Sequence, residues 1–198
     1  MKEQLNQGKW SENVIIADAD YIDSVAFHLI VNFERMIGRR IPPADMARWI
    51  DCIALDGGVR EGENEIQVVL IHDKEKVKMA NFVPAEYASE LSGKAFKDHL
   101  GEFVVDSYPV EEMTTKDDFL FDVLAMVAAE KNVQRIMVVP NAEEGDIYDR
   151  IRQHLRHVGE RKNVTVFAMQ PMPGGNFKQE ILGYSLMQAL GIRADEIK

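Results

Sequence analysis

Acidic side chains follow the buried segments of the chain and are the residues best suited to chemistry. They are, in chain order and with one amide among them, Asp18, Asp20, Asp117, Asp118, Asn141, Glu143, Glu144 and Asp146. Ligands of open α/β sheets bind beyond the carboxyl ends of the strands, so these side chains are expected at one edge. Clustered carboxylates repel one another unless a cation neutralises them, which predicts Mg²⁺ or Mn²⁺ held by oxygen ligands. Such an ion can activate water for attack on a phosphodiester.

Helix capping offers a structural explanation for some of these acids. Acidic residues in a first helical turn complement the helix dipole and cap free N–H groups, so Asp117 and Asp118 could serve only as caps. Asp18 differs, because an acid at the end of an apolar strand has no evident local structural task. Asp18 is therefore the strongest functional candidate.

Apolar periodicity predicts the elements that must position these residues. Apolar, β-branched runs predict strands, and apolar residues at helical spacing predict helices. The strands are expected at 13–17, 65–72, 102–110, 135–140 and 163–170, and the helices at 25–37, 44–55, 84–91, 114–130, 146–158 and 177–191. Buried strands that alternate with helices predict an α/β fold, a three-layer sandwich around a central, mainly parallel sheet.

Composition limits the classes of partner. The chain has 198 residues, of which 23 are Lys or Arg and 33 are Asp or Glu, and its formal net charge is -10. This balance excludes a protein that grips nucleic acid over a broad basic surface. A single cysteine, Cys52, excludes an intramolecular disulfide and a cysteine-based zinc site. The polar opening MKEQLNQGKW predicts no signal peptide, and no apolar run approaches about 18 residues, so we expect no membrane contact and a cytoplasmic location.

The order of elements and acids resembles the PIN/NYN family of metal-dependent ribonucleases. The segment VIIADADYIDSVAF (14–27) resembles its opening strand with a D-x-[NDS] motif. KDDFLFDVLAMVAAE (116–130) resembles its central helix, and RIMVVPNAEEGDIYDRI (135–151) stands where the family has a strand followed by S-x-D-x-[DN]-[FY] and a helix. The match covers about 13–170, and the insertion 73–100 is outside the family's pattern.

This resemblance implies a PIN/NYN-like metal-dependent endoribonuclease. The implied catalytic residues are Asp18, Asp117 and Asp118, the implied ligands of Mg²⁺ or Mn²⁺ are Asp18, Asp118, Glu144 and Asp146, and the implied substrate contacts are Asp20, Asn141 and Arg150. The third motif reads PNAEEGD, so either Glu144 or Asp146 could supply its acid. With a net charge of -10, any contact with RNA is expected to be weak or transient.

Two alternatives stand beside the nuclease hypothesis. The first is a catalytically silent domain that keeps the fold and serves as a binding module or scaffold. The second is a phosphatase, because Asp18-Ala-Asp20 also resembles the haloacid-dehalogenase opening, in which the first Asp is a nucleophile and the second a general acid. That pattern requires Thr or Val where Ile22 stands, a Lys after a strand, and a late Gly-Asp motif that Gly145 and Asp146 could supply.

The C-terminal segment predicts the remaining organisation of the chain. We expect a flexible N-terminus at 1–12, the α/β domain at 13–170 and a helical appendage at 171–198. The helix expected at 177–191 has little polar surface on its middle turns, so it must pack either on its own sheet or in a homodimer interface.

Overall fold

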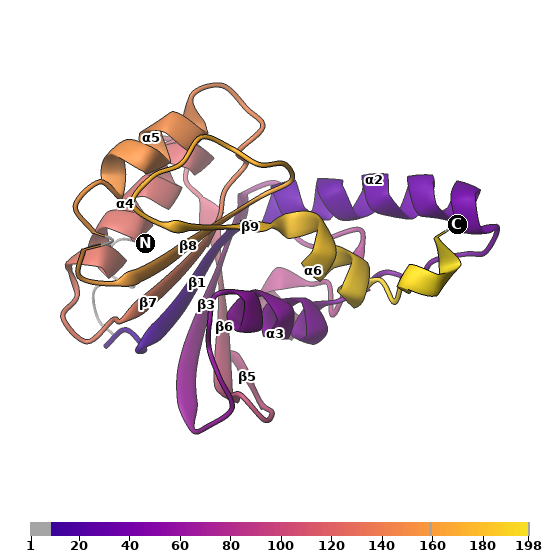
Figure 1. Ribbon diagram of the computed structural model, residues 1–198, viewed down its shortest axis with the longest axis horizontal. Helices are drawn as coiled ribbons and strands as arrows, with labels where there is room; N and C mark the ends of the chain where they lie inside the picture. The colour runs from indigo at the N-terminus through magenta and orange to yellow at the C-terminus, as the bar shows by residue number, and fades with distance from the viewer. Residues whose placement is uncertain (1–8, 159, 198) are drawn as a thin grey trace.

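A seven-stranded sheet forms the centre of the protein, for which the computed structural model describes residues 9–158 and 160–197 (Figure 1). The strand order is β5-β6-β3-β1-β7-β8-β9. The strands are β1 (Asn13–Asp18), β3 (Asn64–Asp73), β5 (Lys94–Lys97), β6 (Gly101–Val110), β7 (Arg135–Val139), β8 (Asn163–Ala168) and β9 (Lys178–Ile181). All neighbours pair in parallel except β5, which is antiparallel to β6.

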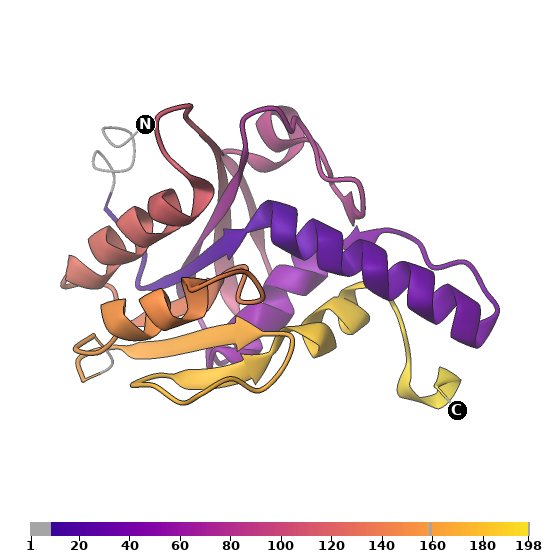
Figure 2. The same cartoon turned by 90° about the horizontal axis from the view of Figure 1, so that it is seen from above.

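Helices cover both faces of this sheet, as Figures 1 and 2 show. They are α2 (Ala19–Ile37), α3 (Met46–Asp56) and α6 (Leu182–Ala189) on one face, and α4 (Lys116–Ala129) and α5 (Ile147–His154) on the other. The prediction of an α/β sandwich with a mainly parallel sheet is confirmed. Shorter elements are the paired strands β2 (Ala44–Asp45) and β4 (Phe82–Val83), a wide helical turn at Tyr87–Leu91 and a short one at Ala194–Glu196.

The central strand β1 divides the core into two parts. Every residue of β1 is buried, because β3 and β7 flank it and helices lie above and below. Ile15 and Ala17 face the core beneath α2, α3 and α6, whereas Val14 and Ile16 face the core beneath α4 and α5. This alternation follows from the period of two along a strand, and it leaves Asp18 at the carboxyl edge of the sheet.

Several elements differ from their predicted bounds. Helix α2 begins at Ala19 instead of residue 25, because Asp18 caps it. The predicted helix 84–91 is reduced to the turn Tyr87–Leu91, and α5 ends at His154. Part of the predicted helix 177–191 is strand β9, which pairs with β8 along Thr165–Ala168. The hydrogen-bonding edge of β8 therefore overrides the local helical pattern.

Both ends of the described chain pack on the α/β domain. Of the N-terminus predicted to be flexible, residues 1–8 lie outside the described residues, but Trp10 is buried and its carbonyl accepts a hydrogen bond from the Asn132 side chain. At the other end, Leu182 and Leu186 of α6 are buried in the core that they share with α3. No helix among the described residues has the length and apolar character needed to cross a bilayer.

The close approach of β3 and β6 gives a test of the sheet. Gly101 has a φ of +144°, and a Cβ atom there would lie 2.1 Å from the backbone oxygen of Asn64. We expect Gly101→Ala to cost about 2–4 kcal/mol in the free energy of unfolding, measured by urea denaturation. Gly174→Ala is the matched control, since nothing lies within 4 Å of a Cβ atom there. Equal stability of the two variants would contradict this account of the register.

Candidate functional site

Asp18 has a structural task that its sequence position did not reveal. Its side chain is 1% exposed and accepts a hydrogen bond of 3.0 Å from the backbone N–H of Tyr21. It therefore caps the N-terminus of α2. This corrects the expectation that an acid at the end of this strand has no local structural role.

The ammonium group of Lys116, the first residue of α4, lies among three carboxylates at the carboxyl edge of the sheet. Its Nζ atom is 3.2 Å from Asp18 Oδ1, 2.9 Å from Asp20 Oδ2 and 3.9 Å from Asp73 Oδ2. Lys76 Nζ adds a contact of 3.2 Å to the other oxygen of Asp20. We call these five residues the acid–lysine cluster. The ammonium group of Lys116 thus compensates Asp18 at the end of β1, Asp20 at the start of α2 and Asp73 at the end of β3.

The electrostatics of the cluster reflect burial opposed by pairing. Burial is the largest influence on Asp18 and raises its pKa, and the charge of Lys116 offsets part of this effect. For Asp20, burial also opposes ionisation, but hydrogen bonds from Lys116 and from the N–H of Asp73, together with the two lysine charges, hold its pKa below the usual range. Burial disfavours the charged form of Lys116 too, yet the surrounding carboxylates raise its pKa, so it stays protonated at neutral pH.

Aromatic side chains line the sides of the acid–lysine cluster. The hydroxyl of Tyr21 donates a hydrogen bond of 2.8 Å to Glu143, in the loop after β7. The ring of buried His72, at the end of β3, stacks on Tyr87 with centroids 3.7 Å apart. Burial lowers the pKa of His72, so its imidazole is neutral at physiological pH. The aromatic neighbours of the cluster, Tyr21, His72 and Tyr87, therefore add no positive charge to it at physiological pH.

The other predicted site residues form a second, more exposed group. Asp118 pairs with Arg150 at 2.7 Å, and that guanidinium lies 4.1 Å from the centroid of the Phe121 ring. Burial raises the pKa of Asp117, the charge of Lys116 offsets part of this effect, and the nearby charge of Glu144 raises the pKa again.

The remaining predicted residues lie in the loop that precedes α5. Asp146 stands at the N-terminus of α5 without a side-chain capping bond, and the carbonyl of Asn141 accepts the N–H of Glu144 at 3.4 Å. Backbone hydrogen bonds hold both residues in the loop, and among the described residues neither forms a hydrogen bond or ion pair with Asp18. The predicted acids that form ion pairs thus meet two different cations, since Lys116 pairs with Asp18 and Asp20 and Arg150 pairs with Asp118.

The residues present do not fit the predicted Mg²⁺ or Mn²⁺. The proposed ligands Asp18 and Asp118 contact different cations, and Glu144 and Asp146 are exposed. Within 9–158 and 160–197, the acid and histidine side chains that bring three ligand atoms within 4.8 Å of one another belong to Asp51, Asp98 and His99. That trio lies on α3 and on the turn between β5 and β6, and it includes none of the predicted ligands.

Sequence reasoning missed the cations that complete the site. Lys116 directly precedes the acid pair that drew attention to α4, and Lys76 lies in the unexplained insertion 73–100. The loop after β7 reaches the site through Glu143, which accepts the hydroxyl of Tyr21, and not through the predicted metal ligands Glu144 and Asp146. A signal was available for Lys116, since a lysine at a helix start beside buried acids is positioned to pair with them.

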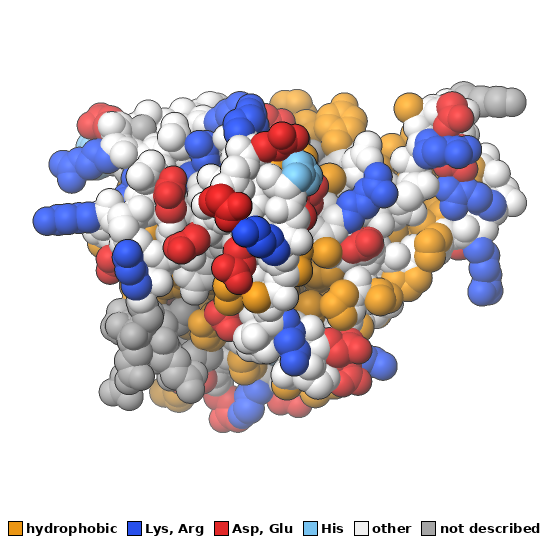
Figure 3. Space-filling view, turned by 90° about the horizontal axis from the view of Figure 1, so that it is seen from below, with side chains coloured by type: hydrophobic (Ala, Val, Ile, Leu, Met, Phe, Trp, Pro, Cys, Tyr) orange, Lys and Arg blue, Asp and Glu red, His pale blue; other side chains and the backbone are white. Residues whose placement is uncertain are grey.

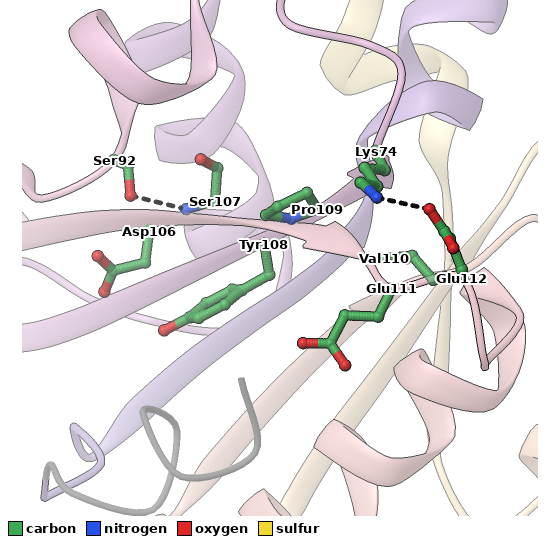
Figure 4. A pocket seen from close by; sticks show the side chains of 9 residues that line it. All are labelled: Lys74, Ser92, Asp106, Ser107, Tyr108, Pro109, Val110, Glu111 and Glu112. Atoms are coloured by element: carbon green, nitrogen blue, oxygen red, sulfur yellow. Dashed lines mark hydrogen bonds and ion pairs between the residues drawn. The ribbon is translucent and has the colours of Figure 1, made fainter.

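A cavity of about 760 Å³ lies along the outer edge of β6 (Figure 4). It exists because β5 pairs only with residues 102–105 of β6, and among the described residues no strand pairs with the outer edge of β6 beyond Val105. In it Lys74 pairs with Glu112 at 2.8 Å, and the N–H of Ser107 donates to Ser92 Oγ at 3.4 Å. Its acids Asp106, Glu111 and Glu112 outnumber its one lysine, so it offers no focus for an anionic substrate.

Comparisons with known proteins add the family and no activity. No curated protein and no solved structure matches the chain. A protein family matches residues 7–197, and it is described as a family of unknown function, DUF6621.

The lysine contacts predict a pH-dependent loss of stability. Lys116→Ala leaves Asp18 and Asp20 buried with less compensation, and removing one partner of a buried pair typically costs about 3–5 kcal/mol. In the variant, the folded-state pKa of both carboxyls rises above the unfolded value of about 3.9, so the folded state takes up protons first as pH falls. We expect the stability gap to the native chain to be widest near pH 8 and to narrow towards pH 5, in urea denaturation.

Lys97→Ala is the matched control for this experiment. Lys97 pairs with Glu63, and their side chains are 60% and 86% exposed. Exposed pairs contribute about 0–1 kcal/mol, so this variant should lose little stability at either pH. A gap for Lys116→Ala that stays constant over the pH range would contradict the assigned role of Lys116.

Proposed function

The chain belongs to the DUF6621 family, and from that premise we propose that it is a catalytically silent binding or scaffold domain of PIN/NYN-like fold. The observation that supports this most directly is the position of Lys116 Nζ, 3.2 Å from Asp18 and 2.9 Å from Asp20. The positive charge that a carboxylate cluster requires comes from the chain itself. No divalent ion is then needed to hold the acids together.

The contacts of the Asp18 carboxylate also support a silent site. Asp18 Oδ1 accepts the capping hydrogen bond from the N–H of Tyr21 and also forms the ion pair with Lys116. The Asp18 side chain is only 1% exposed. A ligand ion would have to displace an ammonium group whose pKa is raised by the same acids. The nuclease hypothesis is therefore less well supported than its silent alternative.

The proposed relationship to the PIN/NYN family rests on the placement of its motifs. Asp18 ends β1, Asp117 and Asp118 lie in the first turn of α4, and Asp146 stands before α5. These positions belong to one edge of the sheet, which is where the resemblance requires them. Contact with RNA stays a weaker proposal, because the chain has a net charge of -10.

A phosphatase is the second candidate, and the neighbourhood of Asp18, Asp20 and Lys116 favours it. The haloacid-dehalogenase pattern requires a nucleophilic Asp, a second Asp and a Lys close together, and the distances of 3.2 Å and 2.9 Å are suitable. Burial weighs against it, because a nucleophile must reach a phosphorus atom and the Asp18 side chain is 1% exposed. The capping bond to Tyr21 also holds that carboxylate in place.

The proposed partner of the domain is a second copy of the chain. Helix α6 packs on its own domain, yet Tyr184 on its outer side is 68% exposed. Phe27 and Val31, one turn apart on α2, are also exposed. Figure 3 shows hydrophobic side chains gathered at and to the right of the centre of this face, with charged side chains of both signs on either side of them. Exposed aromatic and apolar residues of this kind are typical of interfaces.

The location of the protein stays a prediction. A reducing, cytoplasmic compartment fits the single cysteine, whose thiol is half-buried in α3. Burial raises the pKa of Cys52 to about 11, and the nearby charges of Asp51 and Asp56 add to this effect. The thiol is thus protonated and unreactive at physiological pH.

Removal of the lysine should create a metal site where none exists. We expect Mn²⁺ to leave the melting temperature of the native chain unchanged, because Lys116 compensates the acids. In Lys116→Ala, Mn²⁺ should raise the melting temperature, because an ion can then replace the ammonium group. The double variant Asp18→Asn/Lys116→Ala is the control and should respond less.

The same preparations distinguish the three functional hypotheses. Mn²⁺ or Mg²⁺ binding to the native chain, abolished by Asp18→Asn in calorimetry, would contradict the silent-domain proposal and favour the nuclease. Hydrolysis of p-nitrophenyl phosphate by the native chain, lost in Asp18→Asn, would favour the phosphatase. Absence of both signals supports a silent domain.

Association with a second copy is measurable by sedimentation velocity. We expect the native chain to sediment as a dimer at micromolar concentration and Tyr184→Glu to shift it to monomer, because a buried charge would replace an apolar contact. Met113→Glu is the matched control, since Met113 is 97% exposed on the loop before α4. A native chain that is monomeric throughout would contradict the proposed partner.

A further inference from the structure

A basic cavity lies at the edge of the sheet opposite Asp18. It has a volume of about 500 Å³ and is formed where β7, β8 and β9 begin and where α3 ends. Its charged lining residues are Arg135, Lys162 and Lys178, and no acid is among its lining residues. The chain as a whole carries a net charge of -10, so this concentration of positive charge is local.

Arg135, the first residue of β7, is the least compensated cation of the cavity. Its Nη1 atom donates a hydrogen bond of 2.8 Å to the carbonyl of Gly57, while its Nε atom is buried and has no hydrogen-bond partner. Among the described residues no carboxylate oxygen lies within 4.0 Å of its guanidinium. Burial lowers its pKa, the like charge of Arg60 lowers it further, and the charge of Glu12 opposes both effects. A partly buried guanidinium that no carboxylate contacts directly favours an anion beside it.

The glycines that end α3 leave room for this guanidinium. Gly58 has a φ of +93°, and a Cβ atom there would lie 2.8 Å from Arg135 Nη1. A Cβ atom on Gly57 would lie 2.3 Å from Met137 Sδ. The turn thus requires glycine both for its conformation and for the approach of Arg135.

The two lysines of the cavity are held by different partners. Lys162 donates to the carbonyls of Val133 and Glu130, so backbone groups fix its position without neutralising its charge. Lys178 pairs with Glu180 at 2.9 Å, and its side chain is 61% exposed. Among the described residues neither Arg135 nor Lys162 forms an ion pair within 4.0 Å, although the nearby charges of Glu12 and Glu130 act on them. Asn163, Thr165 and Asn176 add polar groups to the lining.

We propose that this cavity binds a small molecule through its phosphate group. Arg135 and Lys162 supply two positive charges that no carboxylate contacts directly, which match the charge of a phosphate dianion, and a guanidinium is the side chain best suited to bind one. The volume of about 500 Å³ is within the range of small-molecule sites. This site is separate from the acid–lysine cluster, so it does not depend on whether that cluster is silent.

Calorimetry with two probes, AMP and inorganic pyrophosphate, tests the site on the native chain at low ionic strength. Both should bind, and Arg135→Gln should weaken both by about 10-fold or more, since the variant loses a charge-assisted hydrogen bond to the phosphate. Lys178→Gln, a change on an exposed side chain that leaves the fold intact, should weaken binding by a smaller factor. Amide resonances of Gly58 and Asn176 should shift on titration and so locate the ligand.

Arg193→Gln is the matched control, because Arg193 is 72% exposed, pairs with Asp195 and is not among the residues that line the cavity. It should bind both probes as the native chain does. Tighter binding of AMP than of pyrophosphate identifies a nucleotide ligand, and the reverse order identifies free phosphate compounds. No heat with either probe, or equal weakening by Arg193→Gln and Arg135→Gln, would overturn the proposal.

Discussion

The ion pair between Asp18 and Lys116 joins the central strand to the first residue of α4, and the carboxyl edge of the sheet is arranged around it. An acid with 1% exposure at the end of a fully buried strand must be compensated, since an unpaired buried charge is among the most costly features in a protein. The same carboxylate caps α2, so the entry of that helix and the entry of α4 are fixed relative to each other. Asp20 extends this constraint to β3, because it accepts the N–H of Asp73 while it binds Lys116. The segments that follow β1, β3 and β6 at this edge are thus held together by one lysine.

The two edges of the sheet carry opposite local charge. At the carboxyl edge, carboxylates are buried and compensated from within the chain. At the amino edge, Arg135 and Lys162 bind backbone carbonyls instead of acids, and their charge stays available to a ligand. The net charge of -10 describes neither edge, because a ligand responds to the nearest groups and distant charges are screened. The excess of acids argues against broad contact with polyanions but is compatible with one small anionic ligand.

Periodicity alone predicted the layers and most of the strands, because apolar runs buried on both faces leave few other arrangements. It missed the first six residues of α2, since the cap and the buried first turn depend on a contact between Asp18 and Tyr21. It also missed β9, whose pairing with β8 is a tertiary effect. For the candidate site, the sequence drew attention to Asp18 and to the start of α4, where the acid–lysine cluster lies. It could not separate Asp118, which pairs with Arg150, from Asp18, which pairs with Lys116, because the helix positions of acids do not reveal which cation each one meets.

The position of Lys116 within its own helix bears on what the acid–lysine cluster is for. A cation at the N-terminus of a helix opposes the helix dipole, and Lys116 is the first residue of α4, directly after the capping Thr115. The helix itself gains nothing from a lysine there, and its first-turn acids Asp117 and Asp118 already supply the favourable charge. The placement makes physical sense only through the carboxylates that surround Nζ, and their charges raise the pKa of that ammonium group although burial and the helix dipole oppose its charged form. An ammonium group beside the carboxylates would repel a divalent ion, so a metal site is better without one. A domain that keeps Asp18 and Asp20 buried without an ion requires the ammonium group of Lys116 to balance their charge. The lysine therefore argues for permanent compensation within the fold.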